Sequence, residues 1–119
     1  MQFLRYTAAG ATATLVHYAL LLALVEALRW PVARAAALGA LAGAAVAYLL
    51  NRRVTFSVPV PHRQALPRFA AVAVLGALLN GAIVGSAIRW GAHYLAAQVA
   101  ATLAVLLLTF QLNKTWSFR

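Results

Sequence analysis

Four long apolar runs constrain the fold of this chain more than any other feature of its sequence. They cover about Tyr6–Leu28, Ala35–Leu50, Phe69–Ile88 and Tyr94–Leu112. A helix needs roughly 20 apolar residues to cross the hydrocarbon core of a bilayer. Helices satisfy their backbone hydrogen bonds internally, which a segment surrounded by lipid must do. The sequence therefore predicts an all-α membrane protein with four transmembrane helices.

The composition agrees with this class. Of 119 residues, 65% are hydrophobic and 9% are charged, whereas a soluble domain has about 25% charged residues. The net charge of +9 comes from cations that punctuate the apolar runs rather than from a basic stripe on a polar domain, so we expect no nucleic-acid partner. The chain has no cysteine and no constellation typical of catalysis or metal binding. We expect no enzymatic activity, no cofactor and no metal site.

The distribution of Lys and Arg predicts how the chain lies in the membrane. Three cations flank one side of the runs, namely Arg29, Arg34 and Arg89, and seven flank the other, namely Arg5, Arg52, Arg53, Arg63, Arg68, Lys114 and Arg119. Cytoplasmic loops of membrane proteins carry an excess of Lys and Arg. We therefore expect a multi-pass protein of the cytoplasmic membrane with both termini in the cytoplasm. Aromatic residues that suit the outer interface are Trp30, Trp90 and Tyr94.

The second and fourth apolar runs end alike, in LNRRVTF at 50–56 and LNKTWSF at 112–118. Arg5 and Arg68 likewise precede the first and third runs. These matches predict one domain over 1–119 made of two helical hairpins in the same orientation, with repeat 1 at about 3–57 and repeat 2 at about 66–119. A parallel repeat of this kind has its pseudo-twofold axis along the membrane normal. The connection at about 57–67 contains three prolines, which we expect to keep it from being helical.

Small residues recur at every fourth position within the spans. The clearest pairs are Gly39 with Gly43 and Gly81 with Gly85. Such pairs let helices approach closely in lipid, either within one chain or between copies. Four short helices enclose little volume, so we expect a homo-oligomer or a partner subunit.

Several polar side chains fall at membrane depth, where they are costly and often functional. They are Thr14, His17, Tyr18, Asn80 and Gln98. Threonine and asparagine at such positions often bond to their own helix or to a neighbouring one. His17 has three interpretations, as a structural hydrogen-bonding group, as the lining of a polar cavity, or as part of a proton relay.

The two helix endings resemble those of GtrA-like proteins, a family of small four-helix membrane proteins. The first copy carries the aromatic, Asn, cation, hydroxyl and Phe positions as Tyr48, Asn51, Arg52, Thr55 and Phe56, and the second as Phe110, Asn113, Lys114, Ser117 and Phe118. The resemblance implies a role in cell-surface polysaccharide, O-antigen or lipid modification. It implies either translocation of a polyprenyl-phosphate-linked sugar or a non-catalytic anchoring role beside a membrane glycosyltransferase that makes this lipid.

On the translocation hypothesis, the lipid phosphate binds fixed cations and amides at headgroup depth, namely Arg52, Arg53, Lys114, Arg5, Arg68, Asn51 and Asn113. The sugar then passes His17, Tyr18, Thr14, Asn80 and Gln98, while the prenyl chain stays among the membrane lipids. Two alternatives remain open. The cations could serve topology and the binding of anionic lipids, and the two asparagines could be helix C-caps in a left-handed conformation. A proton-coupled small transporter is disfavoured, because the only acidic residue, Glu26, lies near the end of its span.

Overall fold

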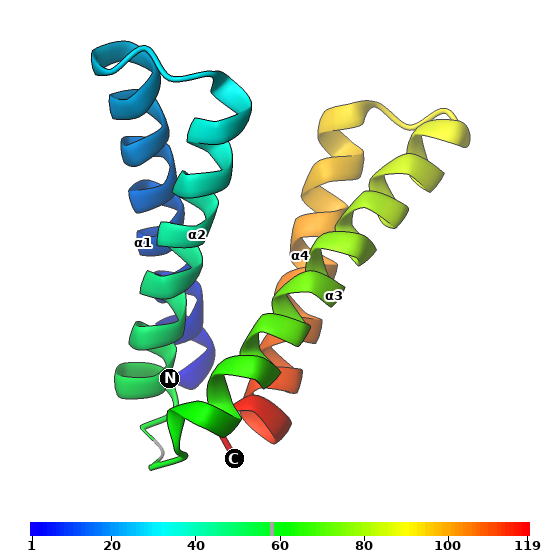
Figure 1. Ribbon diagram of the computed structural model, residues 1–119. Coiled ribbons are helices and arrows are strands. Elements are labelled where there is room, and N and C mark those ends of the chain that lie inside the picture. Colours follow the sequence, from blue (N-terminus) through cyan, green and yellow to red (C-terminus); the bar gives the residue numbers. More distant parts are fainter. Residues whose placement is uncertain (58) are drawn as a thin grey trace. The chain divides into compact units, whose positions relative to one another are not determined.

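The computed structural model describes residues 1–57 and 59–119, and it is helical, without strands, over this part of the chain (Figure 1). The side chains of Ala33 and Tyr94 lie outside the described residues, and so does the interfacial position predicted for Tyr94. Four helices are long and apolar enough to cross a membrane, over Gln2–Ala27, Arg34–Thr55, His62–Arg89 and Leu95–Ser117. The prediction of an all-α membrane protein with four spans is confirmed.

Three of the four helices end in a π-helical turn. The elements in chain order are α1 (Gln2–Leu22), η1 (Ala23–Ala27), α2 (Val32–Leu50), η2 (Asn51–Thr55), α3 (His62–Arg89), α4 (Tyr94–Leu112) and η3 (Asn113–Ser117). They form two compact units, Met1–Val58 and Pro59–Arg119. We call the first unit hairpin 1 and the second hairpin 2. Each is a pair of antiparallel helices joined by a short turn (Figure 1).

The third helix begins earlier than the prolines predicted. It starts at His62, directly after Pro61, and it includes Pro67, so the prediction that 57–67 is non-helical is wrong for its second half. A proline costs a helix the hydrogen bond from its own nitrogen to the carbonyl four residues before. At Pro67 that carbonyl belongs to Arg63, the second residue of α3.

Two glycines of α2 allow it to pack closely on α1. A Cβ atom at Gly39 would lie 2.8 Å from the carbonyl oxygen of His17, and one at Gly43 would lie 2.8 Å from that of Ala13. Real Cβ contacts are longer than this, so only glycine fits at this helix spacing. The small-residue pair predicted for the second span therefore acts within hairpin 1.

The glycines of α3 behave differently. Gly76 faces α4, where an added Cβ would lie 3.0 Å from Cγ2 of Thr109. Gly81 and Gly85 have nothing within 4 Å of such an atom. This second pair is therefore not used for packing within hairpin 2, and its use in contacts outside the hairpin stays a prediction.

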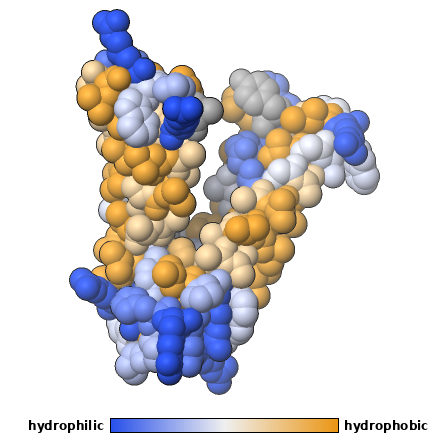
Figure 2. Space-filling view, viewed as in Figure 1, coloured by the Kyte–Doolittle hydropathy of each residue, from blue (hydrophilic) through white to orange (hydrophobic). Residues whose placement is uncertain are grey.

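Most of each hairpin surface is apolar and exposed. Hydrophobic residues cover the middle of each hairpin, and hydrophilic residues gather at its ends (Figure 2). Between 11% and 28% of the most apolar window of each span is buried within the chain. A surface of this kind is stable when lipid or another protein covers it.

Candidate functional site

The repeated sequence endings fold into π-helical turns at the end of α2 and of α4. The amide of Phe56 donates to the carbonyl of Asn51 at 2.9 Å, and the amide of Phe118 donates to that of Asn113 at 3.1 Å. Both asparagines have right-handed helical backbone angles, with φ of −64° and −67°. The alternative of left-handed C-caps is therefore wrong, because the chain keeps helical geometry for one more turn.

The asparagine side chains of these turns point into the hairpins. Asn51 and Asn113 are 2% and 1% exposed. The Thr55 hydroxyl donates to Oδ1 of Asn51 at 2.8 Å, and Ser117, which follows Asn113 at the same spacing, is also buried. In this structure the Asn51 amide stabilises its turn from inside, whereas Oδ1 of Asn113 and the Ser117 hydroxyl have no hydrogen-bond partner among the residues that the structure describes. Neither amide is presented to a ligand at the surface.

An arginine of the preceding helix closes each turn. The Arg5 guanidinium donates to the carbonyl of Val54 at 3.3 Å, and the Arg68 guanidinium donates to that of Trp116 at 3.0 Å. The neighbouring aromatic rings also meet across each helix pair. Tyr6 and Phe56 have centroids 6.2 Å apart, and Phe69 and Phe118 have centroids 5.9 Å apart.

These contacts match between the two hairpins at a few positions. Arg5 corresponds to Arg68, and Val54 corresponds to Trp116. Sequence reasoning placed both arginines at the helix ends but missed their bonds to the turn carbonyls. The repeated arginine-aromatic pair before the first and third runs was the available signal.

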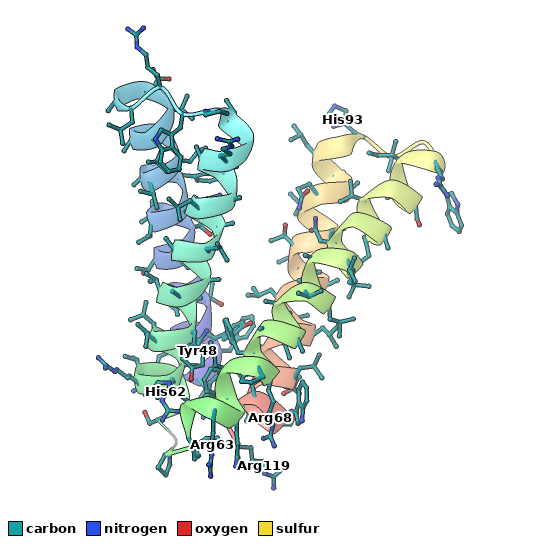
Figure 3. All side chains as sticks on the ribbon, in the orientation of Figure 1. Tyr48, His62, Arg63, Arg68, His93 and Arg119 are labelled. Atoms are coloured by element: carbon teal, nitrogen blue, oxygen red, sulfur yellow. The ribbon has the colours of Figure 1, made fainter. Side chains whose placement is uncertain are left out.

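The remaining cations of the helix endings lie at the surface or partly so. Arg53 and Lys114 are exposed, and Arg52 is half-buried. The Lys114 ammonium lies 5.8 Å from the ring centroid of Phe110. In hairpin 2, Arg63, Arg68 and Arg119 lie at the end that holds η3, and His93 lies at the other end (Figure 3). Each hairpin thus has a cationic ending at which exposed positive charge and a buried amide occur within one turn.

The polar residues within the spans of hairpin 1 are largely engaged with the hairpin itself. The Thr14 hydroxyl donates to the carbonyl of Gly10 at 3.0 Å. The half-buried His17 ring stacks on Tyr18 with centroids 5.3 Å apart, and its Cδ2 atom lies against Gly39. His17 therefore fills space between α1 and α2, and Tyr18, which is 55% exposed, faces outward.

Hairpin 2 has a small amide cluster at membrane depth. The Gln98 amide donates to Oδ1 of Asn80 at 3.0 Å and to the Thr102 hydroxyl at 3.1 Å. The structure thus brings together Asn80 and Gln98, which sequence reasoning named separately. Gln98 is exposed and Asn80 is half-buried, which suits contact with a polar group, and their predicted role on a sugar pathway stays a prediction.

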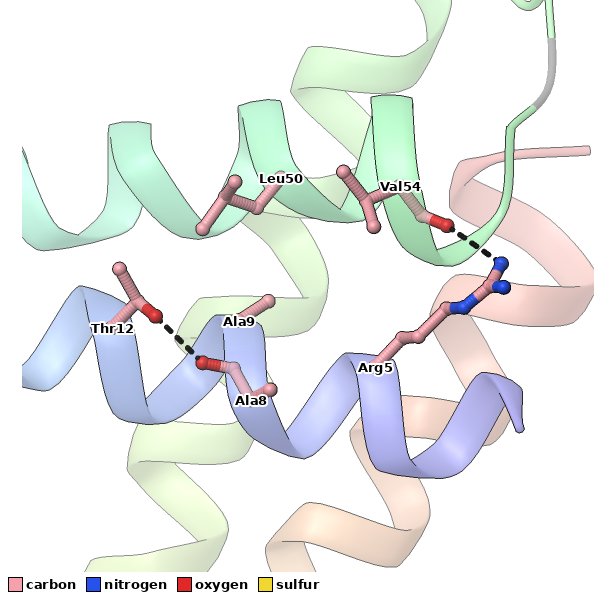
Figure 4. A pocket seen from close by; sticks show the side chains of 6 residues that line it. All are labelled: Arg5, Ala8, Ala9, Thr12, Leu50 and Val54. Atoms are coloured by element: carbon pink, nitrogen blue, oxygen red, sulfur yellow. Dashed lines mark hydrogen bonds between the residues drawn. The ribbon is translucent and has the colours of Figure 1, made fainter.

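Hairpin 1 also contains a groove that the sequence did not indicate. It has a volume of about 200 Å³ and is lined by Arg5, Ala8, Ala9, Thr12, Leu50 and Val54 (Figure 4). Small residues on α1 open this space beside α2. Its existence depends on which faces of the two helices meet, and the alanine-rich composition of the spans hides that signal.

Together, four apolar helices in two hairpins, with a cationic ending on each, define a small helical membrane protein that carries positive charge at the ends of its spans. The family GtrA/DPMS, transmembrane domain, matches residues 5–118. The chain belongs to this family, as the resemblance of its helix endings predicted. Searches of curated proteins and of solved structures found no match.

Family membership places the chain among membrane proteins of lipid-linked sugar pathways. Members of this family are generally non-catalytic. Among the residues that the structure describes, no group of three or more His, Cys, Asp or Glu side chains could hold a metal ion.

Proposed function

We propose that this protein moves a polyprenyl-phosphate-linked sugar from the cytoplasmic to the outer leaflet of the cytoplasmic membrane. The observation that carries the proposal is the pair of cationic helix endings in a chain of the GtrA/DPMS family. A lipid phosphate needs fixed positive charge at headgroup depth, and guanidinium and ammonium groups provide it through charge-assisted hydrogen bonds.

The exposed cations act directly in this proposal. Arg53 and Lys114 can meet a phosphate without a change in the fold, because their side chains are exposed. The buried Asn51 and Asn113 act indirectly, by holding the turns that carry these cations. Arg5 and Arg68 each bond one turn carbonyl and so hold the turns. A guanidinium has five N–H groups, so the exposed Arg5 keeps donors for a phosphate.

The orientation in the proposal follows from charge. The cationic endings and both termini lie on the cytoplasmic side, where Lys and Arg are enriched. The absence of native cysteine allows a direct test with single cysteines at the exposed Gln64 and Ala92. A membrane-impermeant thiol reagent should label Ala92→Cys in intact cells and leave Gln64→Cys unlabelled. The reverse pattern would overturn the orientation.

A second candidate function is a non-catalytic anchor or regulatory subunit of a polyprenyl-phosphate glycosyltransferase. The low burial of the spans favours it, because at most 28% of any span window is covered by the chain itself. The pair of the half-buried Asn80 and the exposed Gln98 also offers hydrogen bonds to a partner helix. In this function the cationic endings bind anionic lipids beside the enzyme.

Reconstitution distinguishes the two functions. The purified protein is placed in liposomes with a fluorescent polyprenyl-phosphate sugar, and transfer between leaflets is followed by quenching from outside. We expect transfer without any glycosyltransferase. Arg53→Ala and Lys114→Ala should each slow it about ten-fold, the effect of losing a charge-assisted hydrogen bond.

Arg34→Ala is the matched control, because it removes an exposed arginine from the other end of hairpin 1 and should leave the rate unchanged. An equal loss in Arg34→Ala would refute a specific role for the cationic endings. Absence of transfer in the unmodified protein, together with co-purification of a glycosyltransferase, would replace translocation by the anchoring function.

A further inference from the structure

The groove of hairpin 1 has a charged end and apolar walls. Arg5 carries the only charge among its six lining residues, which otherwise are Ala8, Ala9, Thr12, Leu50 and Val54. The Thr12 hydroxyl donates to the carbonyl of Ala8 at 2.9 Å (Figure 4), so its hydrogen is used within α1. The groove therefore offers a cation at one end and an apolar surface along the rest.

The corresponding positions of hairpin 2 carry larger side chains. The pairing of Arg5 with Arg68 places Val72 where hairpin 1 has Ala9 and Leu75 where it has Thr12. The pairing of the turn carbonyls places Trp116 where hairpin 1 has Val54. Three of the six lining positions are thus bulkier in hairpin 2, and Leu112 retains the leucine of Leu50.

The largest of these changes covers the arginine itself. The Arg68 guanidinium carbon lies 5.8 Å from the centroid of the Trp116 ring, within the range of a cation–π contact. Arg68 is half-buried, whereas Arg5, beside the smaller Val54, is exposed. The same arginine-to-carbonyl bond therefore leaves one guanidinium open at a groove and the other under an indole.

We propose that the two hairpins are not equivalent, and that the groove of hairpin 1 is the binding site for the phosphate and first part of the chain of a polyprenyl phosphate. This inference rests on the proposed function, and it states which half of the chain holds the lipid. Arg5 binds the phosphate, and the prenyl chain lies against Ala9, Leu50 and Val54. In hairpin 2 the ring of Trp116 lies over the corresponding arginine.

The dimensions of the groove favour a single chain. Its volume of about 200 Å³ is below the roughly 300–1,000 Å³ of sites that enclose a whole small molecule. From Arg5 to Thr12 the helix rises about 10 Å, at 1.5 Å per residue, which is a third of a hydrocarbon core of about 30 Å. The groove therefore fits the start of one chain, and a two-chain phospholipid would leave one chain outside.

The chain itself supplies a test, because hairpin 2 provides the residue that should cover the arginine of hairpin 1. Val54→Trp gives hairpin 1 the residue of hairpin 2 and should place an indole over Arg5. Trp116→Val is the reciprocal control. Binding of polyprenyl phosphate is measured by native mass spectrometry in zwitterionic nanodiscs, with thermal unfolding of each variant recorded alongside.

Val54 is 49% exposed, so Val54→Trp should fold and should weaken binding about ten-fold or more, as loss of a charge-assisted contact does. Trp116→Val should bind as the unmodified protein does. A second pair, Arg5→Gln and Arg68→Gln, should show the same asymmetry, with the loss confined to Arg5→Gln. Folded Val54→Trp that binds normally, or an equal loss in both arginine variants, would overturn the inference.

Competition identifies the occupant. An excess of polyprenyl phosphate should displace the bound polyprenyl phosphate, while the neutral polyprenol, phosphatidylglycerol and inorganic phosphate should not displace it. Equal competition by phosphatidylglycerol would overturn the choice of a prenyl phosphate. The translocation assay separates this inference from the proposed function. If the protein translocates the lipid and Val54→Trp binds it normally, the groove is not the binding site and the proposed function stands. If the lipid binds in the groove but is not translocated, the proposed function is refuted and the groove stands.

Discussion

Gly39 and Gly43 set the spacing of α1 and α2, and replacing either with alanine tests this directly. The added Cβ would lie 2.8 Å from a backbone carbonyl oxygen of α1, and ordinary contact begins near 3.4 Å. The helices would have to separate by about 0.6 Å, the difference of these two distances. A backbone oxygen cannot rotate away as a side chain can, so the whole helix has to move.

The expected cost follows from two opposing contributions. Overpacking of a well-packed contact costs about 1–3 kcal/mol. Alanine also has a higher helix propensity than glycine, by about 1 kcal/mol. At Gly81, where an added Cβ meets nothing within 4 Å, only the propensity contributes. The free energies of unfolding of Gly43→Ala and Gly81→Ala should therefore differ by about 1–3 kcal/mol, with Gly43→Ala the less stable.

The measurement is an unfolding titration with sodium dodecyl sulfate in mixed micelles. Separation of α1 from α2 is followed by fluorescence transfer between two labels, one on a cysteine introduced into each helix at the same end of hairpin 1. The control Gly81→Ala lies in hairpin 2 and therefore carries its labels on α3 and α4. If Gly43→Ala were as stable as Gly81→Ala, the close approach of α2 to α1 described above would be refuted.

Two further substitutions test the polar contacts. Asn51→Ala should lower the free energy of unfolding by about 1–3 kcal/mol, because it leaves the buried Thr55 hydroxyl without its acceptor. Thr55→Val should lower it by about 1 kcal/mol. Chemical denaturation measures both values, and an unchanged free energy of unfolding in Asn51→Ala would contradict the prediction. Asn80→Leu and Gln98→Leu should show a coupling energy of about 0.6 kcal/mol in a double-mutant cycle, and strictly additive effects would show that their hydrogen bond contributes nothing.

The sequence predicted the helices well because apolar length is a local property. Each run had to be helical to satisfy its backbone in lipid, whatever packed against it. The boundaries were less accurate. The second and fourth helices continue past Leu50 and Leu112 into η2 and η3, and α3 begins before Pro67, which was taken as a helix breaker. Pro67 is the sixth residue of α3, beyond the first turn in which a proline is readily tolerated, and the sequence alone did not show that the helix had already begun at His62.

The candidate site was predicted in part. The repeated endings located Arg52, Lys114 and the two asparagines, because those residues recur at fixed spacing. The direction of their side chains was not predictable in the same way. Asn51 and Asn113 are buried within the hairpins because the chain continues into a π-helical turn, and sequence spacing does not distinguish that turn from a left-handed cap.

The sequence by itself determined that this chain crosses a membrane four times and that two of its helices have the same cationic ending. Hydrophobicity, charge and local motifs are properties of the sequence itself, so both conclusions could be drawn without the structure. Only the tertiary structure decided that Arg5 lies open beside a groove while Arg68 lies under Trp116. That difference depends on which residues of two separate helices meet in space. Residues about 48 positions apart, such as Arg68 and Trp116, come together only when the hairpin closes.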